Sequence, residues 1–141
     1  MQDEKPSALQ GRLEAVVEPV MRFVGYASAS ALLVAVAPGL VFALLFGRVA
    51  PTGIEEVVVR NWGFVVGLLG TALVYATYVP ATRRLVLMLS MAGKTCFICL
   101  LVVFAPEWLA TLLAVVLFDG AAAAFFAVYL LATPSEFPGR R

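Results

Sequence analysis

Four long apolar segments dominate the sequence, at residues 23–46, 57–79, 85–104 and 108–132. Each is long enough for an α-helix to cross the roughly 30 Å hydrocarbon core of a bilayer, at about 1.5 Å per residue. Backbone amides inside a bilayer must form their hydrogen bonds within the chain, so each segment is predicted to be a helix. We therefore expect an all-α integral membrane protein, with residues 23–132 folded as a bundle of four transmembrane helices.

The composition excludes most soluble alternatives. The chain has 141 residues, of which 62% are hydrophobic and 13% charged, whereas a soluble domain is about 45–50% apolar and about 25% charged. The lipid bilayer is therefore the first expected partner. A net charge of +1 argues against a nucleic-acid partner. Histidine is absent from the sequence, so a His-ligated metal is excluded and no metal site is expected.

Residues 1–22 are predicted to form a cytoplasmic tail that carries a short amphipathic helix. The apolar side chains that recur there at helical spacing are Leu9, Leu13, Val16, Val17 and Val20. The side chains that fall mostly on the opposite face are Arg12, Glu14 and Glu18. We expect this helix to lie in the inner membrane interface; a partly helical, solvated tail is the alternative. Pro38 and Gly39 are expected to kink the first transmembrane helix.

The basic residues near the segment ends predict the orientation. One side would carry Lys5, Arg12, Arg22, Arg83, Arg84, Arg140 and Arg141, and the other side only Arg48 and Arg60. Because basic residues are enriched on the inner side, both termini are expected in the cytoplasm. Residues 133–141 are then a cytoplasmic C-terminal tail.

One lysine and one aspartate interrupt the last two apolar segments. Lys94 precedes the turn at Pro106 and Glu107 by about as many residues as Asp119 follows it, so the two should lie at the same depth. A lone charge near the bilayer centre costs at least about 2.5–3.5 kcal/mol, and we expect the two groups to neutralise each other. Ser90 and Tyr75 are candidates to join them. The pair is either a latch that fixes the register of the helix hairpin or part of a ligand-binding site.

A second polar cluster precedes the glycine-rich second segment. Arg60 and Asn61 lie near its start, with Glu56 one turn before Arg60 as an ion-pair partner. Arg60 either anchors the helix at the lipid headgroups or turns toward the outer mouth of the bundle. The residues expected to allow close helix packing, within one chain or between chains, are Gly63, Gly67 and Gly70.

Cys96 and Cys99 form a C-x-x-C sequence inside the third segment. The vitamin K epoxide reductase and DsbB families carry such a pair and transfer electrons between thiols and a quinone. The similarity is limited to this tetrapeptide and to the number of helices, and the chain lacks the second cysteine pair of those families. The other interpretation is that these are small packing or lipid-facing residues.

The sequence "RNWGFVVGLLG" at residues 60–70, followed by Lys94 and Asp119 in the last two segments, resembles the DoxX-like group of small four-helix bacterial membrane proteins. The resemblance covers most of the chain from Phe23. It implies a multi-pass protein of the bacterial inner (plasma) membrane. It also implies an accessory or ligand-binding role, with quinone or lipid as the candidate ligand. It identifies no reaction.

We therefore expect a non-catalytic accessory or ligand- or lipid-binding subunit with a midplane site at Lys94 and Asp119. It would assemble with itself or with a larger membrane complex. One alternative is a small proton- or substrate-coupled carrier. The other is a quinone-linked thiol oxidoreductase that uses Cys96 and Cys99. The sequence contains no paired-carboxylate site, no nucleophile with a base and no phosphate-binding loop.

Overall fold

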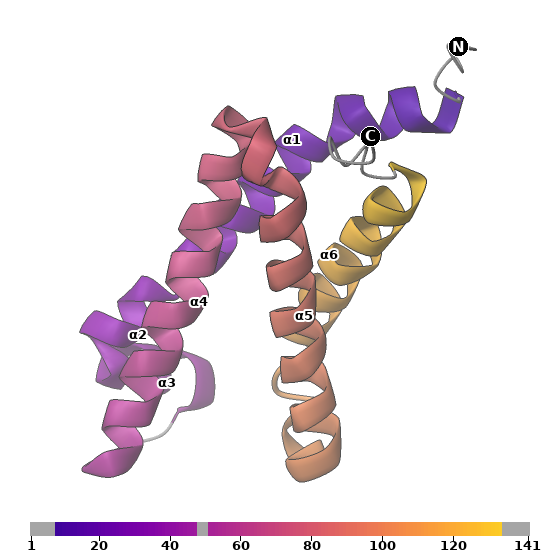
Figure 1. The fold of residues 1–141 in the computed structure, drawn as a ribbon. Helices are drawn as coiled ribbons and strands as arrows, with labels where there is room; N and C mark the ends of the chain where they lie inside the picture. Colours follow the sequence, from indigo (N-terminus) through magenta and orange to yellow (C-terminus); the bar gives the residue numbers. More distant parts are fainter. Residues whose placement is uncertain (1–7, 48–50, 134–141) are drawn as a thin grey trace, which may run out of the picture.

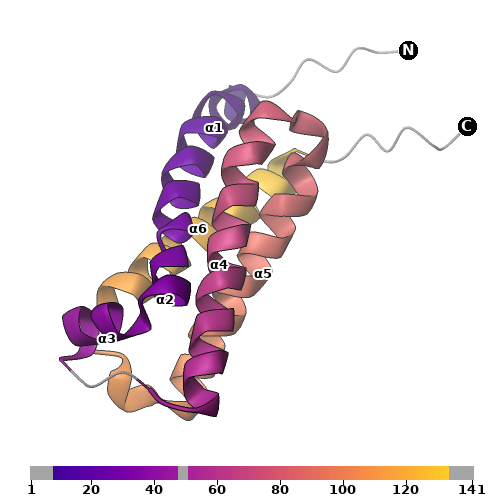
Figure 2. The same ribbon diagram turned by 90° about the vertical axis from the view of Figure 1, so that its left-hand side faces the viewer.

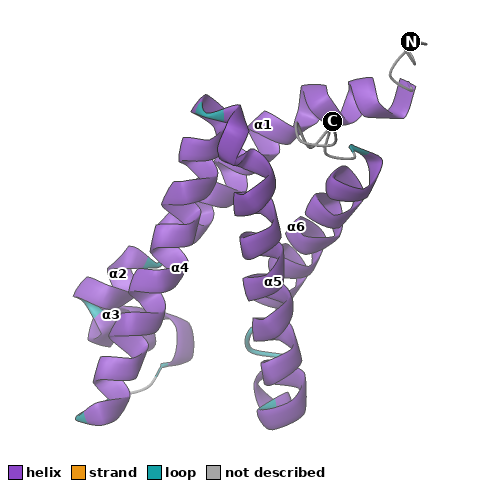
Figure 3. Cartoon of the chain, in the orientation of Figure 1, coloured by secondary structure: helices purple, strands orange, loops and turns teal. Residues whose placement is uncertain are grey.

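The computed structural model describes residues 8–47 and 51–133. Its helices are α1 (Ala8–Ala29), α2 (Leu32–Val36), α3 (Pro38–Phe46), α4 (Ile54–Tyr78), α5 (Pro80–Phe104), the 3-10 turn η1 (Pro106–Trp108) and α6 (Leu113–Ala132). No strand occurs in these described ranges (Figure 3). Four helical stretches are long and apolar enough to cross a membrane: Gln10–Val36, Ile54–Tyr78, Pro80–Phe104 and Leu113–Ala132. The predicted all-helical class and the number of long apolar helices are confirmed.

The first of these stretches differs from its prediction. A separate interfacial helix was expected within residues 1–22, but α1 runs from Ala8 to Ala29 without a break at that boundary. Its apolar face is buried rather than laid on a surface, through Leu13, Val17, Met21 and Val24. These side chains join one core cluster with residues of α4, α5 and α6. The amphipathic stripe therefore continues the packed face of the first long helix.

Two breaks follow α1. The first separates α1 from the five-residue helix α2 at Ser30 and Ala31. The second falls at Ala37, whose backbone leaves the helical region (φ −133°, ψ 64°) just before Pro38 begins α3. Proline is accommodated there because the first residue of a helix has no intrahelical partner for its amide. The predicted kink at Pro38 is thus a full interruption, and α3 is a short helix of its own.

The remaining boundaries follow from the same local chemistry. Pro80 begins α5 directly after Val79, the single residue that joins α4 to α5. The fourth long helix was expected from residue 108, but it begins at Leu113. Pro106 instead opens the short turn η1, and the chain needs four further residues before a regular helix starts.

The helices form two packed pairs. α1 and α2 lie along α4, and α6 lies along α5 (Figure 1). The pairs meet where Val79 joins α4 to α5, and they diverge toward the other end of the molecule. The start of α1 and the end of α6 also lie at the joined end (Figure 2). The largest fully buried side chains are Phe126, Met21, Leu73, Leu87 and Val17.

Glycines allow α4 to contact α1 and α2 closely. A β-carbon at Gly63 would lie 2.8 Å from the Ala31 carbonyl oxygen, and one at Gly67 would lie 2.5 Å from Cγ of Leu32. At Gly70 it would collide with the backbone nitrogen of Ala29. These three glycines thus lie where α4 approaches α1 and α2 most closely, and the contact that they make is within the chain.

Candidate ligand-binding cleft

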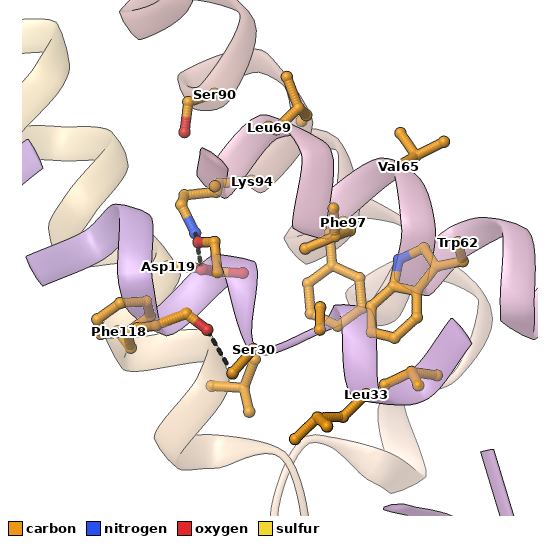
Figure 4. Close-up of a pocket in the computed structure, with 18 of the residues that line it drawn as sticks. Ser30, Leu33, Trp62, Val65, Leu69, Ser90, Lys94, Phe97, Phe118 and Asp119 are labelled. Atoms are coloured by element: carbon orange, nitrogen blue, oxygen red, sulfur yellow. Dashed lines mark hydrogen bonds and ion pairs between the residues drawn. The ribbon is translucent and has the colours of Figure 1, made fainter. Parts of the chain in front are cut away.

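A cleft of about 860 Å³ lies between the two helix pairs, lined by residues of all six α-helices (Figure 4). Its wall is mostly apolar. The apolar side chains labelled in the figure are Leu33, Trp62, Val65, Leu69, Phe97 and Phe118, and the polar ones are Ser30, Ser90, Lys94 and Asp119. Ligand sites in proteins commonly combine such an apolar wall with a few polar groups and a volume of about 300–1,000 Å³.

The ion pair expected between Lys94 and Asp119 is present. Lys94 Nζ donates to Oδ1 of Asp119, which joins α5 to α6. The two side chains are only 10% and 14% exposed, so most of the surface of the pair is covered by the protein. Lys94 also donates to the hydroxyl oxygen of Ser28 at 3.3 Å and lies 5.1 Å from the ring centre of Phe118. Three helices, α1, α5 and α6, therefore converge on one ammonium group.

Of the two residues predicted to lie near this pair, Ser90 lines the cleft and Tyr75 does not. Ser90 lies one helical turn before Lys94, is 3% exposed and lines the cleft. Tyr75 does not join the pair, because its side chain is 56% exposed and does not line the cleft. The glycine face of α4 is turned to α1, and this rotation places Tyr75 on the outside of α4.

Ser28 and Ser30 belong to the site although neither was expected there. Ser28 contacts Lys94, and Ser30 lies at the break that follows. The Ser30 hydroxyl donates to the carbonyl oxygen of Ala27 at 2.7 Å (Figure 4). The amide of Ala31 bonds to the Ser28 carbonyl three residues back, at 3.1 Å. A serine that competes for a backbone carbonyl is typical of a bent or interrupted helix. The first long helix therefore breaks beside the ion pair.

Arg60 completes the second break. Its Nη1 donates to the carbonyl oxygens of Ala35 at 2.6 Å and Val36 at 3.0 Å. These carbonyls end α2 and have no amide of that helix to bond them, because a helix leaves its last four carbonyls without an intrahelical partner. Glu56 holds the guanidinium by accepting from Nε at 2.9 Å and Nη2 at 2.7 Å. The structure contains the Glu56–Arg60 ion pair, and Arg60, whose side chain is 42% exposed, caps the end of α2 without lining the cleft. Asn61 is exposed.

A polar network at the joined end ties α1 to the other pair of helices. Arg83 of α5 contacts Glu18 at 2.7 Å and Glu14 at 3.5 Å, and its side chain is 11% exposed. Tyr129 of α6 donates to Glu14 at 2.9 Å. Within the first pair, Arg22 of α1 donates to the hydroxyl of Thr77 of α4 at 3.3 Å. Sequence reasoning placed both glutamates on a solvated face. The sequence did hold one sign of this network, because Glu14 and Glu18 lie one helical turn apart in a chain that has few charged residues.

Cys96 and Cys99 are free and exposed on the regular helix α5, and Cys96 also lines the cleft. In the part of the chain that the structure describes, no three His, Cys, Asp or Glu side chains group closely enough to hold a metal ion. The redox role of this pair stays a prediction.

Comparison of the chain with models of protein families, with curated proteins and with solved structures found no match. The resemblance to the DoxX-like group therefore rests on the quoted residues alone.

Proposed function

We propose that this protein spans a bacterial inner membrane four times, with both termini in the cytoplasm, and binds a lipid-like ligand in the cleft between its helix pairs. The outward-facing side chains support the membrane assignment. The most exposed large apolar residues are Leu131, Val36, Phe104, Leu44 and Ile54, an exposure that lipid accommodates and water does not. The bilayer midplane would pass near Lys94 and Asp119.

The orientation is supported by the basic residues of the joined end. Arg83 and Arg84 begin α5 there and Arg22 bonds to Thr77 near the end of α4, whereas Arg60 lies near the start of α4, toward the other end. Basic residues mark the cytoplasmic side of membrane proteins. The role as a non-catalytic subunit, assembled with further copies or with a larger membrane complex, rests on the sequence resemblance.

One observation carries the binding function: a large apolar cleft contains a buried, hydrogen-bonded ion pair in its wall. A pure latch needs no adjoining cavity. An ionisable pair that lines an apolar space inside a membrane bundle is instead typical of a site that selects a ligand's polar group. The apolar wall would hold the ligand's hydrocarbon part.

Blocking the cleft tests this proposal. Gly93 lines the cleft, and a β-carbon there would have Leu69 Cδ1 at 3.8 Å as its nearest neighbour. We expect native mass spectrometry of the gently solubilised protein to show bound lipid, and Gly93→Leu to lose it. Gly11→Leu is the matched control, because a β-carbon at Gly11 meets nothing within 4 Å. Equal lipid binding by all three proteins would contradict the proposal.

A small carrier is the second candidate, and the break of the first long helix beside Lys94 favours it. Carriers often bind their substrates where interrupted helices meet near the bilayer midplane. For this function we expect proteoliposomes to dissipate an imposed pH gradient, and Lys94→Gln to abolish that flux. A gradient that decays at the rate of protein-free liposomes would rule out proton coupling.

A further inference from the structure

We infer that the ligand of this cleft is an uncharged lipid whose polar end is a hydroxyl group, that is, a long-chain alcohol. The inference rests on the proposed function and adds the chemistry of the ligand's polar end. It follows from which atoms of the Lys94–Asp119 pair are occupied and which are open.

Two of the three hydrogen-bond donors of Lys94 are occupied. An ammonium group carries three N–H groups and has no acceptor. One bonds to Asp119, and a second bonds to the Ser28 hydroxyl at 3.3 Å. The face of the Phe118 ring, centred 5.1 Å away, is a favourable partner for the remaining positive charge. A ligand group that only accepts hydrogen bonds, such as a ketone or an ether, is therefore limited on this lysine to the one N–H that hydrogen bonds leave open, and it competes there with the Phe118 ring.

The open atom of the pair is an acceptor. A carboxylate has two oxygen atoms, each able to accept hydrogen bonds. Lys94 bonds to Oδ1 of Asp119, and within the described residues no hydrogen bond reaches Oδ2. Asp119 lines the cleft. A ligand whose polar end donates can therefore bond to Oδ2, and hydrogen bonds to a charged acceptor are among the stronger ones.

The charge of the site selects against ionic ligands. Lys94 and Asp119 are the only charged side chains among the described residues that line the cleft, and their charges cancel. A fatty-acid carboxylate would bring an uncompensated charge into an apolar space and would face Asp119. A protonated amine would bring an uncompensated positive charge that faces Lys94. A hydroxyl group donates one hydrogen bond and carries no charge, so its desolvation costs far less.

The shape of the cleft suits a hydrocarbon chain. The ion pair lies at one end of the close-up, and Trp62, Phe97 and Leu33 lie at the other (Figure 4). Trp62 and Phe97 are neighbours, with ring centres 6.2 Å apart. A chain whose hydroxyl bonds Asp119 would thus extend past Phe97 toward Trp62.

This placement allows a direct binding test. The chain has two tryptophans, Trp62 in the cleft and Trp108, which does not line it. In a Trp108→Phe background, bromine near the end of a bound chain should quench the fluorescence of Trp62. The ligands are hexadecanol, hexadecyl methyl ether and palmitic acid, each brominated near the chain end. The same protein with the additional Gly93→Leu change measures the background, that is, the quenching caused by ligand that is dissolved in the detergent and not bound in the cleft.

We expect saturable quenching by the alcohol, with an affinity about tenfold or more above that of the ether and the ionised acid, because only the alcohol donates to a charged acceptor. The ether or the acid binding as tightly as the alcohol would overturn this inference and leave the proposed function standing. If no ligand quenches beyond the Gly93→Leu background, the proposed function itself fails.

A charge variant tests the same reasoning in reverse. Asp119→Asn removes the acceptor's charge and leaves Lys94 uncompensated, so palmitate should then bind about tenfold or more tighter than hexadecanol. A folded Asp119→Asn protein that keeps the preference for the alcohol would overturn the inference. The ligand series on the chain with Asp119 intact decides the question even where this variant does not fold.

Discussion

The charged groups that lie deepest within the long helices have specific partners. Lys94 has Asp119, Arg60 has Glu56, and Arg83 has Glu14 and Glu18. Removing one member of a buried pair leaves a charge that neither water nor a counter-ion stabilises, whereas removing both leaves an apolar contact. The contribution of a pair is therefore visible only when single and double variants are compared.

For the central pair we expect Asp119→Leu or Lys94→Leu alone to lower the free energy of unfolding by about 3–5 kcal/mol. The double variant should recover most of that loss, because no unpaired charge remains. Unfolding of the detergent-solubilised protein, followed by circular dichroism during denaturant titration, measures both. Glu55→Leu is the control at an exposed position. A double variant as unstable as either single one would contradict this account.

At the scale of helices, the glycine face of α4 fixes how α1 and α2 lie against it. The backbone of Ala29 lies so close to Gly70 that no side chain fits between them. We expect Gly70→Ala to destabilise the protein by about 1–3 kcal/mol through overpacking. Gly11→Ala should instead stabilise α1 by up to about 1 kcal/mol, because that position is open and alanine favours helix. Equal stability of the two variants in the same denaturant titration would show that the close contact is not what orients α1.

The sequence was sufficient to predict the long helices, because a bilayer-spanning helix needs a run of apolar residues that nothing else explains. It also predicted the Lys94–Asp119 contact, because a hairpin sets two equidistant residues side by side. The prediction of a separate N-terminal helix was wrong, because the apolar stripe that contains Leu13 and Val17 fits an interfacial helix and a packed helix equally well. The positions of Tyr75 and Ser28 depend on how far α4 and α1 rotate about their axes, and close packing at glycines sets that rotation.

At the scale of the whole molecule, the network around Arg83 joins the start of α1 to the other helix pair. Glu14→Gln with Glu18→Gln would leave the largely buried Arg83 without a counter-charge. We expect the start of α1 to detach, so that trypsin cleaves after Arg12 several-fold faster than in the unaltered protein. Intact-mass measurement of timed digests gives the rate. Glu55→Gln, at an exposed position of α4, serves as the control. Unchanged cleavage in the double variant would show that apolar packing alone holds α1.

The arginine that caps α2 also joins the broken first helix to α4. Its guanidinium bonds to the last carbonyls of α2, at the end of the molecule far from Val79. Val79, whose backbone is not helical, is the single residue that connects α4 to the α5–α6 hairpin. Because Leu44, Leu100 and Ala114 line the cleft at the end far from Val79, we expect a ligand to enter the cleft from that end.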